Sequence, residues 1–272
     1  MGAPSPPRAP AVAGRFYPGS AAEVQRALAA LFPAEAPPPV EATMALCPHA
    51  GWIYSGAICA ETLARVRVPG TCLMLGPNHT GLGPAVSLWR GGPWALPGAR
   101  VPIDRALAER LVASGAFTPD EAAHRFEHCL EVIVPMLYAR NPDVRIVPVV
   151  LGPLALADVR DLGAVVADAV AAGDEPVLLV VSSDMSHYVP ADLARRKDAL
   201  ALARIEAVDP EGLFRTVVAH EISMCGFVPA TVGLFAARRL GATRGTIVRY
   251  GTSGDTSGDL DRVVGYAGAL VR

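Results

Sequence analysis

Short apolar runs bounded by glycine and proline alternate with amphipathic segments, and this alternation constrains the fold more than any other feature of the chain. It is typical of strands and helices in α/β order, so we expect an α/β protein. The predicted strands, mostly buried on both faces, cover residues 42–47, 71–76, 144–152, 175–183, 245–251 and 261–271. The predicted helices cover residues 20–32, 104–114, 119–140, 156–173, 191–208 and 229–241.

Length and charge narrow the class of protein. The 272 residues suffice for one large α/β domain, and we expect one unit over residues 1–272 with residues 1–9 flexible. A net charge of -2 with scattered basic residues gives no electrostatic footprint for nucleic acid. Five cysteines without a CxxC pair, and no secretory or membrane-spanning segment, predict a cytoplasmic protein with reduced thiols.

Side chains that can bind metal or move protons follow three of the predicted strands. His49 and His79 each follow one strand, and Asp184 with His187 follows another. In open α/β sheets ligands collect outside the carboxyl ends of strands, so we expect these loops to share one pocket. Asp184 and His187 can form a carboxylate–imidazole pair, either as a metal ligand with its orienting group or as a general base. Ordinary loop histidines and a capping turn are the structural alternatives.

Cys225 precedes Gly226 at the apparent start of a helix. A helix dipole there would lower the pKa of the thiol and favour the thiolate. The alternative is a small buried apolar residue, which is the role we assign to Cys47, Cys59, Cys72 and Cys129.

The predicted helix over 119–140 carries His124, Glu127, His128 and Glu131 at positions i, i+3, i+4 and i+7, which share one helix face. The histidine spacing resembles that of the zinc-protease HExxH motif. However, Arg125 stands where that motif has its catalytic glutamate, so we do not predict proteolysis. A solvated face with ion pairs is one reading. The apolar surroundings favour residues that support metal ligands or bind substrate.

Other catalytic templates are missing from the sequence. It contains no GxSxG elbow, no P-loop and no GxGxxG after a strand, and the small polar residues at 251–259 are most simply a turn. Ser182, Ser183 and Ser186 lie near His187, so a metal-independent serine hydrolase is an alternative that chelation would test.

Taken together, these residues resemble the MEMO family, whose bacterial members are called AmmeMemoRadiSam system protein B. That family is similar in fold to the LigB-type class III extradiol dioxygenases, which use non-haem iron. The resemblance implies a single three-layer α/β/α domain with a mostly parallel or mixed sheet and a metal pocket at one end. It rests on six motifs in order: PAVAGRFYP at 10–18, PHAGWIYSG at 48–56, GPNHTG at 76–81, AHRFEHCLEV at 123–132, SSDMSHY at 182–188 and CGFVPA at 225–230.

The resemblance also implies a ligand set. It places the metal ligands at His49, His79 and Cys225, with Asp184 and His187 beside them as catalytic residues that orient ligands or move protons. Three protein ligands leave a position open for exchange. Imidazoles suit iron or copper, while a thiolate in place of the dioxygenase carboxylate favours copper(I) or a redox-active iron.

Further positions match motifs around this pocket. By resemblance His128 and Glu131 approach it and bind substrate, and Trp52, Tyr54 and Tyr188 form part of its wall. The implied function is that of a metal-binding protein, and of a dioxygenase-like oxidoreductase if it is an enzyme. The alternative is a non-enzymatic module that binds metal or peptide on the same scaffold. The family name further implies association with an AMMECR1-like protein and a radical SAM protein.

Overall fold

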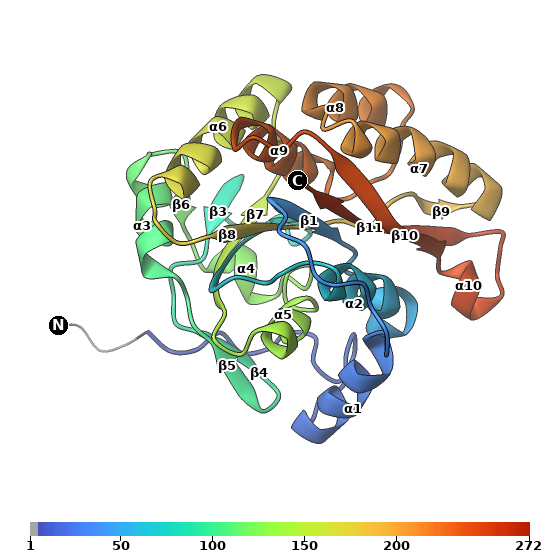
Figure 1. The fold of residues 1–272 in the computed structure, drawn as a ribbon, viewed down its shortest axis with the longest axis horizontal. Helices are drawn as coiled ribbons and strands as arrows, with labels where there is room; N and C mark the ends of the chain where they lie inside the picture. The colour runs from blue at the N-terminus through green and yellow to red at the C-terminus, as the bar shows by residue number, and fades with distance from the viewer. Residues whose placement is uncertain (1–4) are drawn as a thin grey trace.

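A computed structural model describes residues 5–272, and its centre is a mixed sheet that nine strands of this range form (Figure 1). The order across the sheet is β10 (Gly245–Thr252), β11 (Val263–Val271), β1 (Met44–Cys47), β8 (Val177–Ser182), β2 (Thr71–Pro77), β7 (Arg145–Leu151), β3 (Val86–Leu88) and β6 (Thr118–Pro119), with β9 (His187–Val189) paired to β11.

The middle of the sheet is parallel and its margins are antiparallel. Strands β1, β8, β2 and β7 run in the same direction, whereas β11 is antiparallel to β1 and β3 is antiparallel to β7. The predicted α/β class and mixed sheet are confirmed, and each long predicted strand is present. Sequence patterns missed β3, β6, β9 and the hairpin of β4 (Trp94–Leu96) and β5 (Ala99–Val101), because two or three residues are too few to show a period.

Helices cover both faces of the sheet and make three layers (Figure 1). On one face lie α3 (Arg105–Ala113), α6 (Leu156–Ala171), α7 (Ala191–Glu206), α8 (Pro210–Ala219) and α9 (Phe227–Arg239). On the other lie α1 (Ala21–Leu31), α2 (Ala57–Ala64) and α5 (Val134–Arg140). Shorter segments are η1 (Trp52–Gly56), α4 (Ala122–Arg125) and α10 (Gly254–Ser257). No helix within residues 5–272 is long and apolar enough to cross a bilayer.

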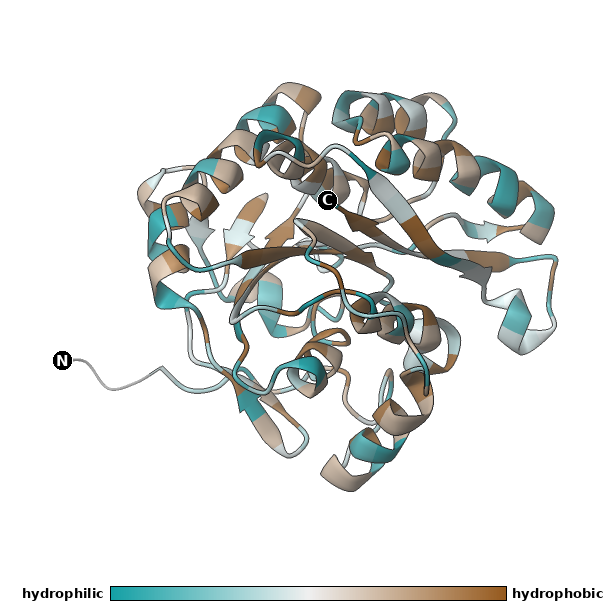
Figure 2. Cartoon of the chain, in the orientation of Figure 1, coloured by the Kyte–Doolittle hydropathy of each residue, from teal (hydrophilic) through white to brown (hydrophobic). Residues whose placement is uncertain are grey.

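Burial of the parallel strands explains their apolar sequences. Every residue of β1 and β2 is buried, and the apolar colouring of Figure 2 is concentrated on the central strands. Helix faces that point outward are more polar in the same figure. At the start of α3, Asp104 accepts a hydrogen bond from the N–H of Leu107 and caps the helix.

The predicted continuous helix over 119–140 is wrong. Helix α4 ends at Arg125, turns follow, and α5 begins at Val134. The Glu127 side chain accepts hydrogen bonds from the N–H groups of His128 and Cys129, and its carbonyl accepts from Arg8. These bonds compete with the helical pattern, so the polar side chains of this segment leave a common face and point to different places.

Residues 8–18, here called the N-terminal strap, run from hairpin β4–β5 to η1. Residues 1–4 of the segment expected to be flexible lie outside the described range, but Arg8 is only 3% exposed and its backbone bonds to Pro93 and Ala95. At the other end, the carbonyl of Phe16 accepts a hydrogen bond from the N–H of Trp52. The strap is therefore tied to the fold on both sides.

Candidate metal centre

The parallel strands bring the predicted loops together. His49 and Asp184 follow β1 and β8, which are adjacent, and His79 follows β2 on the other side of β8. The carboxyl ends of these strands therefore share one edge of the sheet, as the sequence predicted. The closeness is direct, because an oxygen of Asp184 accepts a hydrogen bond of 2.7 Å from the N–H of His49.

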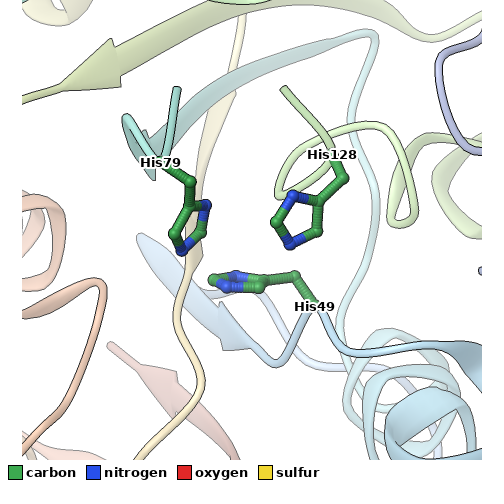
Figure 3. A group of neighbouring side chains, drawn as sticks. All are labelled: His49, His79 and His128. Carbon is green, nitrogen blue, oxygen red and sulfur yellow. The ribbon is translucent and has the colours of Figure 1, made fainter. Parts of the chain in front are cut away.

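Three imidazoles meet at this edge: His49, His79 and His128 (Figure 3). A potential ligand atom of each lies within 4.8 Å of those of the other two. The ring of His49 stands edge-on to the rings of His79 and His128, with centroid separations of 5.2 and 5.5 Å. The rings of His79 and His128 stack at 4.7 Å. The sequence predicted two of these histidines as ligands and the third as a substrate-binding residue.

Hydrogen bonds fix the tautomer of His49. The Ser182 hydroxyl donates its only proton to the carbonyl of Cys129 at 2.6 Å, so it accepts from Nδ1 of His49 at 2.6 Å. Nε2 of His49 is then left with a lone pair, the form that binds a metal. Burial, reinforced by the neighbouring His128 and His79, lowers the pKa of His49 well below its usual value, so the ring is neutral at pH 7.

Glu127 orients the other two rings. One carboxylate oxygen, Oε1, lies 3.0 Å from Nδ1 of His79 and 3.2 Å from Nδ1 of His128. Burial alone would raise the pKa of Glu127, but the hydrogen bonds from His128 and His79 outweigh it and hold that pKa far below its ordinary range. An ionised carboxylate only accepts, so both rings carry a proton on Nδ1, and in a neutral ring with this tautomer the lone pair is on Nε2.

Cys225, just before α9, contacts one histidine of this centre, His49. Its Sγ lies 3.3 Å from Nε2 of His49 and accepts from the N–H of Asp184, also at 3.3 Å. The close approach requires Gly226, because a Cβ there would lie 2.3 Å from the carbonyl oxygen of Ser182. The predicted lowering of the Cys225 pKa is wrong for the metal-free protein. Burial and then the charge of Asp184 raise that pKa, and α9 begins only after Gly226.

Asp184 and His187 occupy different environments. Asp184 is 5% exposed, and burial raises its pKa to about 6, even though hydrogen bonds from the backbone of His49 and Ala50 oppose the shift. His187 begins β9 and donates from Nδ1 to the carbonyl of Ser223 at 2.8 Å, which leaves Nε2 free. A carboxyl group that titrates close to neutrality and a free imidazole nitrogen are suited to proton transfer.

The structure does not support Ser186 as the nucleophile of a serine hydrolase. The Ser186 hydroxyl donates to a carboxylate oxygen of Asp198 at 2.6 Å instead of to His187. The second oxygen of Asp198 accepts from the Tyr250 hydroxyl at 2.7 Å. Asp198 is fully buried on α7, so Ser186 is a structural anchor for the turn before β9.

Glu131, predicted to bind substrate, has a different role. It is completely buried, and its oxygens accept from Arg8 and Ala11 at 2.7 Å, from Val12 at 2.9 Å and from Tyr17 at 3.1 Å. All four donors belong to the N-terminal strap. The helix break places Glu131 in the turns before α5, where its buried carboxylate contacts the strap.

The three aromatic residues predicted to wall the pocket differ in burial. Trp52 is 5% exposed, packs on Tyr17 and donates to the carbonyl of Val132. It lines an apolar cavity of about 530 Å³ together with Phe16 and Tyr17. Tyr54 and Tyr188 are 43% and 66% exposed. A substrate-binding role for these aromatic residues stays a prediction.

Sequence reasoning assigned no role to Phe16, whose ring centroid lies 4.9 Å from that of His128. The motif PAVAGRFYP contained the signal, since it was one of the segments that carried the family resemblance. Ser182 also lies in one of these segments, SSDMSHY, but its orienting role could not be predicted from sequence, because it depends on which strand lies next to β1.

Comparison with known protein families identifies the family of this chain. A family model described as Memo-like protein matches residues 8–270. The chain belongs to the MEMO family. A MEMO1 family protein of Aquifex aeolicus is 42% identical over 97% of this chain and 98% of its own length. Another, from Methanopyrus kandleri, is 37% identical over 97% of this chain and 99% of its own.

A solved structure shares the fold of this MEMO-family chain at much lower identity. It is an uncharacterized protein from Escherichia coli K12, with a TM-score of 0.59 and 16% identity. The alignment covers 84% of this chain and 98% of the other. At this identity the likeness extends to the fold alone.

Proposed function

We propose that this MEMO-family protein binds one redox-active metal ion, iron or copper, through His49, His79 and Cys225. The proposal rests on the way hydrogen bonds orient the potential donor atoms. Nδ1 of both histidines is held by another group, which leaves Nε2 free, and Sγ of Cys225 lies 3.3 Å from Nε2 of His49. Orientation of ligand imidazoles through the distal nitrogen is general in metal sites.

The donor set fits this group of metals. Two neutral imidazoles and a sulfur form a site softer than the oxygen-rich sites that hold magnesium or calcium. The metal would supply Lewis acidity or electron transfer to a bound small molecule or peptide. The raised pKa of the Cys225 thiol fits as well, because a thiol in an apolar site stays protonated until a cation replaces its proton.

Asp184 and His187 are proposed to move protons for the bound substrate. Asp184 can hold or release a proton near neutral pH, since its pKa is raised to about 6. Nε2 of His187 is free to accept a proton, because Nδ1 is bonded to the Ser223 carbonyl. In this proposal the protein is an oxidoreductase.

A second candidate is a non-enzymatic binding module, and the exposed apolar side chains near the site favour it. Ile53, Phe126 and Tyr188 are 73%, 67% and 66% exposed; Phe126 and Tyr188 adjoin Glu127 and His187 in sequence, and Ile53 lies four positions after His49. Apolar groups gathered around a cleft are typical of surfaces that bind a partner. Association with an AMMECR1-like protein and a radical SAM protein belongs to the same proposal.

Metal analysis of anaerobically purified protein tests the metal site. We expect wild-type protein to hold close to one iron or copper ion per chain, and Cys225→Ala to lose most of it. Cys72→Ala is the matched control, because Cys72 is a buried thiol on β2. Equal metal content in wild type and Cys225→Ala would contradict the thiolate ligand.

Oxygen consumption separates the two functions. With metal-loaded protein, a reductant and candidate catechols, the oxidoreductase consumes oxygen, and Asp184→Asn reduces the rate. A metal-loaded protein that stays silent with all substrates supports the binding module.

A further inference from the structure

His128 lies as close to the proposed centre as the two proposed histidine ligands do. Its ring stacks on His79 and meets the edge of His49, and its potential ligand atom lies within 4.8 Å of theirs (Figure 3). Its side chain is about a quarter exposed. The ring of Phe16 lies 4.9 Å from it and limits its movement.

The Glu127 carboxylate is surrounded by donors that belong to the centre. Oε1 accepts from Nδ1 of His79 and from the N–H groups of His128 and Cys129, and it lies 3.2 Å from Nδ1 of His128. Oε2 accepts from the N–H of His79 at 2.6 Å. One buried carboxylate thus fixes the backbone and the ring of both histidines.

We propose that His128 is a further ligand of the same metal ion, and that Glu127 is the positioning residue that aims His79 and His128 at it. This inference rests on the proposed metal site. It gives the protein an all-imidazole donor set of His49, His79 and His128 next to the thiolate of Cys225. Imidazole sets suit divalent ions of intermediate softness, whereas the thiolate favours copper(I), so one pocket offers donors for both oxidation states of a bound metal.

The geometry of Glu127 makes a conservative variant informative. In Glu127→Gln only one side-chain oxygen remains, and it will face the donors now held by Oε1. The new NH2 group then points at the N–H of His79, where two donors lie 2.6 Å apart and repel. The variant keeps the shape of the side chain and an oxygen near both rings, but it loses the negative charge that holds their Nδ1–H groups and the acceptor for the His79 N–H, so both rings are held less firmly.

The test is an anaerobic titration of metal-free protein with Co²⁺, followed by absorption spectroscopy. Wild type, His128→Ala, Glu127→Gln, His49→Ala and Cys225→Ala are compared, and His220→Ala is the control because His220 is exposed at the end of α8. We expect Glu127→Gln to weaken Co²⁺ binding about 10–100-fold, as loss of an orienting group does, and His128→Ala to weaken it at least as much. The sulfur-to-cobalt charge-transfer band should persist in both variants.

The outcomes separate the two proposals. No Co²⁺ binding by wild type overturns the metal site and this inference together. Binding lost in His49→Ala and Cys225→Ala but unchanged in His128→Ala overturns the role of His128 alone.

Nitrogen-15 NMR of metal-free protein gives a readout independent of binding. We expect His79 and His128 in the Nδ1–H form in wild type and a mixture of tautomers in Glu127→Gln. Unchanged tautomers in Glu127→Gln would overturn the positioning role.

Discussion

Glu131→Leu should release the N-terminal strap. Glu131 and Arg8 form an ion pair of 2.7 Å inside the protein, with side chains 0% and 2% exposed. The same carboxylate binds the strap at Ala11, Val12 and Tyr17. Leucine has a similar volume and no acceptor, so the substitution removes every one of these bonds while it fills the space.

The cost follows from the groups left behind. Breaking a buried ion pair by removing one partner costs about 3–5 kcal/mol, since the other charge stays buried. In the variant Arg8 still donates to the carbonyls of His124 and Glu127 and still lies over the ring of Trp94. The cost of its unpaired charge is therefore at the lower end of this range, about 3 kcal/mol. Buried Val12 loses the acceptor for its N–H, at about 1–3 kcal/mol. We expect a total loss of about 4–6 kcal/mol, a large part of the roughly 5–15 kcal/mol that stabilises a typical protein.

Urea unfolding followed by tryptophan fluorescence measures this loss, because Trp52 and Trp94 both contact the strap. Arg8→Met and the double variant complete a thermodynamic cycle. The double variant should be more stable than the two single losses predict, by at least about 2 kcal/mol, since it leaves no unpaired charge. Additive losses, or a Glu131→Leu effect below about 1 kcal/mol, would refute a strap held by buried charge.

Three further predictions concern other buried groups. Burial lowers the pKa of His124 to about 4, so between pH 6.5 and 4 only the unfolded chain takes up this proton. The free energy of unfolding, measured at a series of pH values, should therefore fall by about 3 kcal/mol as the pH is lowered across that window. His124→Leu should not show this fall. Burial raises the pKa of Asp184 to about 6, so above that pH its charge opposes folding. Asp184→Asn should therefore stabilise the metal-free protein at pH 7 by up to about 3 kcal/mol in the same assay. A variant that is no more stable than wild type would contradict this. Gly226→Ala should lower the free energy of unfolding by about 1–3 kcal/mol and weaken Co²⁺ binding, because its Cβ would clash with the Ser182 carbonyl and force the turn to move. Unchanged stability and binding would contradict this prediction.

The sequence predicted the parts of the centre that depend on strand ends. His49, His79 and Asp184 each follow a strongly apolar strand, and parallel strands place such residues at one edge whatever the remaining structure. Cys225 could be predicted as a ligand only from the family resemblance, because nothing in its local sequence shows which strand α9 packs on. The α/β class was predictable from the alternation of strands and helices, whereas the three layers and the mixed sheet were predicted from the family resemblance.

The predictions that failed depended on interactions between distant segments, which local sequence patterns do not reveal. The segment around Glu127 has helical periodicity, yet contacts with Arg8 and His79 outweigh local preference and break the helix. Glu131 then faces the strap instead of the pocket. The pKa of Cys225 depends on how deeply the sulfur is buried beside Asp184, and a dipole estimated from sequence contains no such information.

The separation of the donors along the chain has a consequence for biosynthesis. Nε2 of His49 and Sγ of Cys225 meet although 176 positions separate them in sequence. A nascent chain has most of the sheet strands before it has the cysteine, so it can bury much of the core while the centre still lacks its sulfur. Metal retained through Cys225 would therefore mark chains whose synthesis has passed residue 225, and metal could be captured before β10 and β11 complete the sheet.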